Sequence, residues 1–319
     1  MCLVINRLVF VQVFGERDLS MAYLVTGGMG FIGWHTINEL SERYPTAKIL
    51  CLDNLSLSTE KDLPSNVEFI KGDVRNLELV ESLLKECKHG VIHLAADSRV
   101  LPSIQDPRLV SDSIDTNVKG TANLLISMAK IGLWLPFVYA GSSTAYGDHN
   151  SPQTENMLPR VQSPYSATKL SGEILIQSFV VTFGARATVL RYFQVYGPNQ
   201  PSTGPYALVT GIFLKQAREG SPLTIEGSGQ QTRDFVHVRD VARANVMALN
   251  INSEGKPINI GTGKSHSIKQ LADLISDKQI MVPARKIDLP GTCAVTEKAE
   301  KELGWVAKIT LEEGIRELL

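Results

Sequence analysis

Short apolar runs alternate with helix-length amphipathic stretches through the first two thirds of this chain. The run AYLVT is followed by a glycine cluster and by apolar residues at helical spacing from Phe31 to Leu40. Strand-length apolar runs then recur at residues 48–52, 67–70, 90–94, 137–140 and 188–190. Strands that alternate with helices are joined by right-handed crossovers, so the pattern predicts an α/β fold around a parallel sheet.

The alternation stops after Arg191. A turn-rich segment (GPNQPSTGP) follows, and we expect a helix over residues 206–218, a strand over 223–226 and a closing amphipathic helix near Leu311. These elements predict a smaller C-terminal α/β lobe. The expected division is an N-terminal extension (1–20), a sheet domain (21–190 and 234–262) and the second lobe (191–233 and 263–319).

Charge and cysteine content exclude several classes of protein. The formal net charge is −1 and Lys and Arg form no run, so no nucleic-acid partner is expected. The four cysteines lack metal-ligand spacing, which indicates free thiols, no metal site and a cytoplasmic protein. Polar residues interrupt the apolar stretch before Met21, which resembles a second start, so neither a signal peptide nor a membrane partner is expected.

The segment TGGMGFIG places Gly27, Gly30 and Gly33 between the first expected strand and the first helix. Without side chains at these positions, backbone N–H groups and the positive end of the helix dipole can approach a pyrophosphate. Glycine turns also serve packing alone. Together with the alternating pattern, the motif predicts a doubly wound Rossmann sheet that binds a dinucleotide.

Asp53 ends the second expected strand, twenty residues after Gly33. A carboxylate there accepts hydrogen bonds from both ribose hydroxyls of an adenosine and repels a 2′-phosphate, which favours NAD over NADP; alternatively, Asp53 only opens the turn DNLS. Asp73, in KGDVRN, either binds the adenine amino group or closes a strand-end turn. The residues of these turns expected to bind NAD are Gly27, Gly30, Phe31, Ile32, Gly33, Asp53, Asn54, Asp73, Val74 and Ala95.

Several motifs carry a family resemblance over residues 21–319. The GxxGxxG spacing, HLAA, Asn117 within a helix, YGD, and Tyr165 four residues before Lys169 resemble the extended short-chain dehydrogenases/reductases. The segments LRYFQVYGP, QTRDFVHVRDVARA, INIGTG and ELGW, with Arg285 and Asp288, are similar to the NAD-dependent nucleotide-sugar epimerase and dehydratase branch. The nearest relatives that the motifs indicate are UDP-hexose 4-epimerases.

The resemblance implies a catalytic set. Inverting a sugar carbon requires removal of both its hydroxyl proton and its hydrogen, and NAD accepts the hydride. Tyr165 is the expected base, and Lys169, on the same helix face, and an oxidised nicotinamide would favour its phenolate; both residues also contact NAD. Ser142, in AGSSTAYG, would orient the sugar hydroxyl and share its proton. A YxxxK pair also occurs on helix surfaces, and serine-rich strand ends also form plain turns.

The residues after Ser142 separate the possible reactions. Dehydratases of this family carry Asp and Glu at the next two positions and decarboxylases carry a Glu, whereas this chain has Ser143 and Thr144. Epimerisation is therefore favoured. Two alternatives remain: a nucleotide-sugar 4,6-dehydratase or decarboxylase with unusual acids, whose product would differ in mass, and a non-catalytic NAD-sensing regulator, because fold does not imply activity.

The sugar nucleotide needs fixed cations for its diphosphate. The resemblance assigns this role to Arg233 and Arg285, whose guanidinium groups suit phosphate oxygens, although either can be a solvated surface charge. Asp288 would contact the nucleoside. Ser142, Ser143 and Thr144 would line the sugar site, as would Gln194, which replaces the usual Asn and either still reaches the substrate or shifts it.

Two further positions and two helices complete the expectations. Thr292, seven residues after Arg285, occupies the position that gates the C2 substituent of the sugar, and its small side chain suggests room for an N-acetyl group. Trp34 replaces a usual small serine and either packs under the turn or alters the cofactor site. Long helices within residues 109–130 and 163–183 would pair two subunits in a homodimer.

Overall fold

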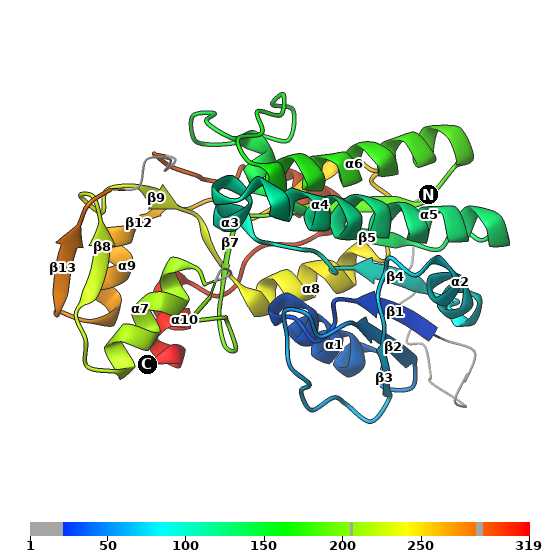
Figure 1. The fold of residues 1–319 in the computed structure, drawn as a ribbon, viewed down its shortest axis with the longest axis horizontal. Helices are drawn as coiled ribbons and strands as arrows, with labels where there is room; N and C mark the ends of the chain where they lie inside the picture. Colours follow the sequence, from blue (N-terminus) through cyan, green and yellow to red (C-terminus); the bar gives the residue numbers. More distant parts are fainter. Residues whose placement is uncertain (1–21, 205–206, 285–289) are drawn as a thin grey trace, which may run out of the picture.

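The computed structural model describes residues 22–204, 207–284 and 290–319; the expected extension, Tyr206, Arg285 and Asp288 lie outside these ranges. A seven-stranded, all-parallel sheet lies at the centre, with strand order β11-β6-β5-β4-β1-β2-β3 (Figure 1). The predicted fold class, a doubly wound Rossmann sheet, is confirmed. The strands are β1 (Ala22–Thr26), β2 (Lys48–Asp53), β3 (Val67–Lys71), β4 (Gly90–His93), β5 (Phe137–Ser142), β6 (Ala187–Tyr192) and β11 (Pro257–Ile260).

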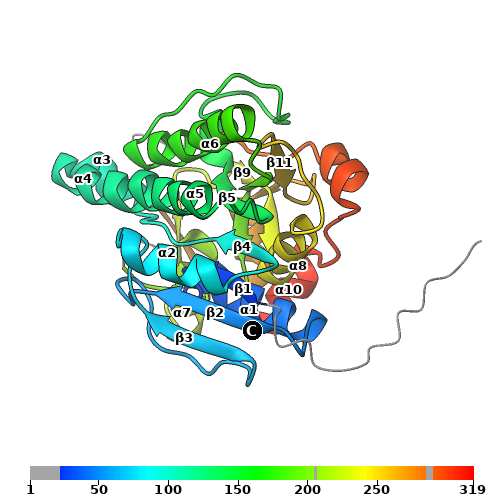
Figure 2. The same cartoon turned by 90° about the vertical axis from the view of Figure 1, so that its right-hand side faces the viewer.

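Helices cover both faces of this sheet, which explains why its strands read as almost continuous apolar runs. Alternate residues of β1 face opposite layers: Tyr23 and Val25 pack toward α1 and α8, and Leu24 packs toward α2 and α5. Figures 1 and 2 show α5 and α6 side by side on one face, with α1 and α8 on the other. The helices are α1 (Phe31–Arg43), α2 (Leu77–Glu86), α5 (Gly120–Ile131), α6 (Pro164–Phe183) and α8 (Val238–Ala248).

The helix expected within residues 109–130 is not uniform. The short helices α3 (Val100–Gln105) and α4 (Val110–Ser113) precede a π-helical turn, Ile114–Lys119, which leads directly into α5. Such a turn inserts an extra residue into the helix and is often found near functional sites. Here it contains the buried Asn117.

The C-terminal elements have a core of their own. Phe213, Ile225, Leu271 and Ile315 belong to a buried cluster separate from the two cores of the sheet. The strand predicted at 223–226 is confirmed, and the described part of the helix expected over 206–218 begins at Val209. The elements are β7 (Gln194–Tyr196), α7 (Val209–Arg218), β8 (Leu223–Glu226), β9 (Thr232–Arg233), β10 (Phe235–His237), β12 (His266–Ser267), α9 (Ile268–Ile275), β13 (Gln279–Val282) and α10 (Leu311–Leu318).

Within the described residues, no helix has the length and apolarity needed to cross a membrane. The same residues contain no group of His, Cys, Asp and Glu side chains that could hold a metal ion.

Candidate active site

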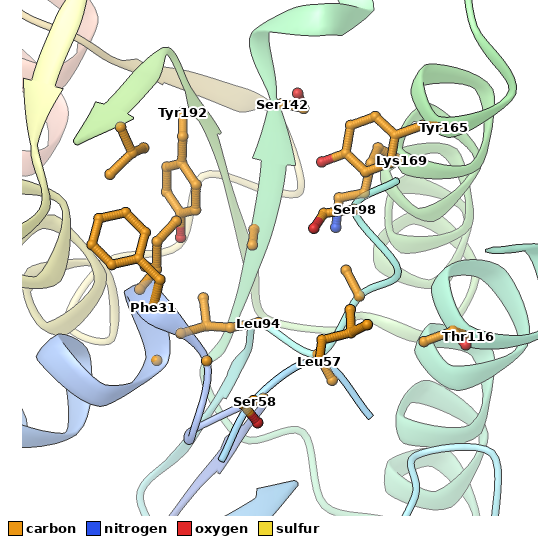
Figure 3. Close-up of a pocket in the computed structure, with 18 of the residues that line it drawn as sticks. Phe31, Leu57, Ser58, Leu94, Ser98, Thr116, Ser142, Tyr165, Lys169 and Tyr192 are labelled. Atoms are coloured by element: carbon orange, nitrogen blue, oxygen red, sulfur yellow. The ribbon is translucent and has the colours of Figure 1, made fainter. Parts of the chain in front are cut away.

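A cavity of about 370 Å³ opens at the carboxyl ends of β1, β2, β4, β5 and β6, where open parallel sheets bind ligands. Figure 3 shows Tyr165 and Lys169 on one side of it, Phe31 and Tyr192 on the other, and Ser58 at the end opposite Ser142. Every residue predicted to bind NAD lines this one cavity. So do Ser142, Ser143, Thr144 and Gln194.

The glycine turn is shaped so that side chains are excluded from it. Gly27 has φ +70°, and a Cβ there would lie 2.6 Å from the backbone nitrogen of Ala95. A Cβ on Gly33 would lie 2.0 Å from the carbonyl oxygen of Gly27. Gly30 caps α1 without a side-chain hydrogen bond, so N–H groups of the first helical turn remain available for an anion. This cradle fits a dinucleotide pyrophosphate.

Asp53 forms a turn and also faces the cavity. Its Oδ1 accepts hydrogen bonds from Leu55 N (2.8 Å) and Ser58 Oγ (3.1 Å), which makes it the first residue of the turn after β2. Its Oδ2 accepts one from Met29 N (3.0 Å) in the glycine turn. The carboxylate also lines the cavity, so turn formation and ligand contact do not exclude each other.

Asp73 lies in a tight local network at the same end of the cavity. Arg75 donates to both of its oxygens (2.9 and 2.7 Å), and Asn54 Nδ2 donates to Oδ2 (2.8 Å). Burial raises the pKa of Asp73, but these hydrogen bonds outweigh burial and lower the pKa to about 2. Asp73 is therefore ionised and closes a strand-end turn while also lining the cavity.

Trp34 contacts the loop between β2 and β3. Its Nε1 donates to the carbonyl oxygen of Asp62 (2.9 Å), in the loop between β2 and β3. In the same loop, Lys61 Nζ donates to the carbonyl oxygen of Met29. These two contacts fasten the β2–β3 loop, whose Leu57 and Ser58 line the cavity, to the start of α1.

Tyr165 lies in the first turn of α6, directly after the helix begins at Pro164. Ser163 caps this helix through its hydroxyl, which accepts a hydrogen bond from Ser166 N. Burial raises the pKa of Tyr165 to about 12, and a hydrogen bond with Ser142 acts in the opposite direction. Ser142 Oγ in turn hydrogen-bonds Thr144 Oγ1 (2.9 Å). The structure thus brings Tyr165 and Ser142 together as predicted.

Lys169 is 3% exposed, one helical turn after Tyr165 on α6. Its Nζ lies 4.3 Å from the ring centroid of Tyr139. Burial lowers the pKa of Lys169 to about 7, and Glu173 acts in the opposite direction. Tyr165 and Lys169 therefore lie on the same helix one turn apart, as expected. In the protein alone, however, burial disfavours both the charged form of Lys169 and the phenolate of Tyr165. Formation of the Tyr165 phenolate needs a further positive charge in the cavity.

Asn117 joins α6 to the loop after β4. Its Nδ2 donates to Thr168 Oγ1 (2.9 Å) on α6 and to the carbonyl oxygen of Asp97 (2.9 Å), and its Oδ1 accepts from Asp97 N (2.7 Å). In the sequence, Asn117 stands out only as part of a resemblance. Cavity-lining residues not predicted from the sequence include Leu57, Ser98, Thr116 and Tyr192, of which Tyr192 is detectable from its position at a strand end.

Not every described residue that was predicted to contact the sugar nucleotide lines this cavity. Among the described residues, its lining includes neither Arg233 nor Thr292. Arg233 ends β9, and its Nη1 donates to the carbonyl oxygen of Thr232 (2.7 Å). Thr292 N also donates to that carbonyl oxygen (3.1 Å), which places the two predicted residues on adjacent segments.

Comparison with known proteins identifies the family. The model of the NAD dependent epimerase/dehydratase family matches residues 23–261. A putative UDP-glucose 4-epimerase of Methanocaldococcus jannaschii is 37% identical, covering 93% of this chain and 96% of the relative. The structure of the Thermotoga maritima UDP-glucose 4-epimerase with UDP-glucose is 33% identical, with a TM-score of 0.85, covering 93% of this chain and 96% of that one. The Thermus thermophilus UDP-glucose 4-epimerase complex with NAD is 31% identical, with a TM-score of 0.83, covering 93% and 97%. The chain therefore belongs to the NAD dependent epimerase/dehydratase family, as its motifs predicted.

Proposed function

We propose that this chain is an NAD-dependent epimerase that inverts a carbinol carbon of a nucleotide-diphosphate sugar, with Tyr165, Lys169 and Ser142 as its catalytic residues. The observation that carries the proposal is the distribution of acids in the cavity. Its described lining contains two carboxylates, Asp53 and Asp73, and both lie at the glycine-turn end, away from Ser142. A sugar beside Ser142 thus meets hydroxyl groups and no acid for elimination of water.

NAD fits the opposite end of the cavity. The cradle of Gly27, Gly30 and Gly33 would hold its pyrophosphate, and Asp53 would accept hydrogen bonds from the adenosine ribose. When bound, NAD supplies a hydride acceptor and the positive charge that the pair of Tyr165 and Lys169 lacks in the protein alone. Phe31, Ile32, Asn54, Asp73, Val74 and Ala95 would complete its surroundings.

The protein's own part of the reaction is a proton relay. Ser142 would hydrogen-bond the sugar hydroxyl and pass its proton to Tyr165, whose phenolate Lys169 stabilises from the same helix face. After the keto sugar turns over in the cavity, Tyr165 would return the proton through Ser142. Ser143 and Thr144 supply hydroxyl groups to that part of the cavity. Because the proton and the hydride taken from the sugar would both be returned to it, substrate and product have equal mass.

The substrate we propose is a UDP-sugar of glucose configuration, because this is the substrate named for the relatives above. In this proposal Arg233 and Arg285 bind the diphosphate, Asp288 contacts the nucleoside, and Gln194 contacts the sugar nucleotide. We further propose that residues 21–190 and 234–262 form the NAD-binding domain and that residues 191–233 and 263–319 form the sugar-nucleotide lobe. Thr292 would leave room for an N-acetyl group at C2.

The test is incubation of the purified protein with UDP-glucose, UDP-N-acetylglucosamine and UDP-glucuronate, followed by proton NMR of the products. We expect an epimer of unchanged mass from at least one of them and none from the Tyr165→Phe variant. A product that has lost water or carbon dioxide would instead support the dehydratase or decarboxylase alternative. Full activity of the variant would contradict the assigned base.

We also propose a homodimer formed through α5 and α6. The outward faces of these helices expose large apolar side chains, among them Ile126, Ile174 (57%), Val181 (87%) and Phe183. A Val181→Lys variant should then sediment as a monomer while the wild-type protein sediments as a dimer. A cytoplasmic location is proposed from the described cysteines, Cys51, Cys87 and Cys293, which are free thiols.

A further inference from the structure

A buried ion pair joins α6, the helix of Tyr165 and Lys169, to β6, and neither of its residues lines the cavity. Glu173 on α6 and Arg191 on β6 are 1% and 3% exposed. Arg191 holds the carboxylate with two groups, Nε to Oε1 at 3.1 Å and Nη2 to Oε2 at 2.7 Å. Neither residue is conspicuous in the sequence, although Glu173 continues the spacing of Tyr165 and Lys169 by one more helical turn.

This pair fastens the catalytic helix to the strand end that carries Ser142. Arg191 is in register with Gly141, the residue before Ser142, across β5 and β6. A Cβ on Gly141 would lie 2.9 Å from Glu173 Oε1, so the carboxylate packs directly against this strand end. The ion pair therefore helps to set the position of α6, and of Tyr165 on it, relative to Ser142.

The charges buried here leave one cation in excess. Arg191 is a cation, Glu173 is an anion and Lys169 adds a second positive charge when it is protonated; none of the three is more than 3% exposed. The guanidinium carbon of Arg191 lies 4.8 Å from the ring centroid of Tyr146, and among the described residues Lys169 forms no ion pair of its own. A buried ammonium is costly unless an anion lies near it, and Glu173 is the carboxylate one turn away on the same helix.

We propose that Glu173, held by Arg191, is a positioning residue that keeps Lys169 cationic and directed toward Tyr165. The proposal rests on the catalytic roles given above to Lys169 and Tyr165. Arg191 has a second part in it: because the guanidinium already binds both oxygens of the carboxylate, Glu173 does not draw the ammonium into a closed pair. Lys169 therefore remains at the cavity surface (Figure 3).

Titratable and charged side chains from several elements lie near Lys169. His93 on β4 is neutral because burial lowers its pKa to about 3. Burial lowers the pKa of Lys169 itself, and Glu173 is the group that opposes this. The remaining titratable or charged neighbours are Tyr139 on β5, Tyr165 on α6, Arg191 on β6 and, beyond Tyr165, Asp97.

Two substitutions should move the proton affinity of Lys169 in opposite directions. Glu173→Gln removes the anion, so Lys169 loses its proton at lower pH. Arg191→Met frees the carboxylate to pair with Lys169, which then keeps its proton to higher pH. We expect the alkaline limb of the kcat profile to move by about one pH unit downward and upward, respectively, which is the scale for a unit charge several ångströms away at an effective dielectric constant of about 20.

Each single variant is expected to be less stable, because Glu173→Gln leaves Arg191 buried without its carboxylate and Arg191→Met removes the guanidinium that binds both oxygens of Glu173. The double variant Glu173→Gln with Arg191→Met removes both charges, should unfold close to the wild-type temperature, and should keep the downward shift. The matched control is Arg243→Met, which removes an Arg from another Arg–carboxylate pair, with Asp240 on α8. It should lower the melting temperature without moving the alkaline limb.

A second measurement needs no turnover. Neutral amines react with acetic anhydride and ammonium groups do not, so competitive labelling of Lys169 at a series of pH values, followed by peptide mass spectrometry, gives the midpoint of its titration. Opposite shifts of this midpoint in the two single variants support the proposal; equal midpoints in all proteins overturn it. An inactive wild-type protein would refute the proposed function, and the labelling midpoints would still decide this inference.

Discussion

The sheet domain and the C-terminal lobe are built by different means. On the sheet side, Gly33 is fixed by contact with the backbone of Gly27, and Lys169 is buried against Tyr139. On the lobe side, Arg233 lies on a two-residue strand, and Thr292 lies in a loop held to it by a backbone hydrogen bond. The cavity that holds Tyr165 and Lys169 is thus set by a continuous sheet and its helices, whereas the positions of Arg233 and Thr292 are set by loops and a two-residue strand.

Loops on the lobe side are gathered mainly through one buried carboxylate. Asp234 accepts hydrogen bonds from Thr262 N (2.7 Å), Gly263 N (3.0 Å) and Ala294 N (3.0 Å), which come from distant parts of the chain. From this difference we expect that substitutions on the sheet side abolish the reaction, whereas those on the lobe side change which substrate is accepted.

The largest effect is expected from Tyr165→Phe. Removing the hydroxyl removes the general base, so turnover should fall by roughly 10²–10⁴-fold. Bound NAD, measured by absorbance after heat release, and the melting temperature should stay near wild-type values because the ring remains. Turnover within about tenfold of wild type would contradict the expectation that substitutions on the sheet side abolish the reaction.

Gly33→Ala should weaken the binding of NAD. The new Cβ would lie 2.0 Å from the carbonyl oxygen of Gly27, so the cradle must deform, at a cost of about 1–3 kcal/mol and up to about a hundredfold in NAD affinity. Calorimetric titration with NAD measures this. Gly132→Ala is the control: a Cβ on Gly132 meets nothing within 4 Å, and Gly132 does not line the cavity, so NAD affinity should be unchanged.

Lys169→Met should change how stability depends on pH. Burial lowers the pKa of Lys169 from 10.5 to about 7, so between these values the unfolded chain binds the proton that the folded protein releases. Wild-type stability should therefore rise with pH across this window relative to the variant, by up to about 1.4 kcal/mol per pH unit. Urea unfolding at several pH values measures the difference, and a flat difference would show that Lys169 keeps its ordinary pKa.

Thr292→Tyr tests the lobe side. A bulky ring at this position should reduce kcat/KM for UDP-N-acetylglucosamine by roughly tenfold or more and leave that for UDP-glucose nearly unchanged, because only the acetylated sugar needs the space. Thr292→Ser is the matched control and should change neither value. Equal losses with both sugars would mean that residue 292 acts on the fold and not on substrate choice.

The smallest effect is expected from Trp34→Phe. The ring remains, but the hydrogen bond to Asp62 that fastens the β2–β3 loop is lost. NAD should dissociate a few-fold faster, in line with about 0.5–1.5 kcal/mol for one hydrogen bond. Stopped-flow fluorescence with excess competing nucleotide measures this rate; a slower release would contradict the role given to the loop.

The sheet and its cofactor end were predictable because their signals are local. Strand, glycine turn and helix follow one another without a gap from Ala22 to Arg43, and the carboxyl ends of parallel strands must meet at one edge. The pairing of Asn117 with Thr168 and of Glu173 with Arg191 was not predictable, since it depends on how α6 packs against other elements.

Electrostatics at the site were predictable only in part. The i, i+4 spacing placed Tyr165 and Lys169 on one face of a helix, and that expectation holds. Burial is a property of the whole fold, so the sequence could not show that it raises the pKa of Tyr165 and lowers that of Lys169. Two-residue strands such as β9 and β12 could not be predicted from the sequence either. The alternation of apolar and polar residues that indicates a strand needs a longer run to be detectable.

The most direct test of the central claim is the fate of the carbon-bound hydrogen during inversion. UDP-glucose deuterated at C4 is incubated with the protein in ordinary water, and the C4 epimer is isolated and analysed by NMR and mass spectrometry. Removal and return of a hydride within one closed site predicts that the epimer keeps its deuterium at C4. Replacement of that deuterium by hydrogen from the solvent, or an epimer formed equally fast by Tyr165→Phe, would contradict the account.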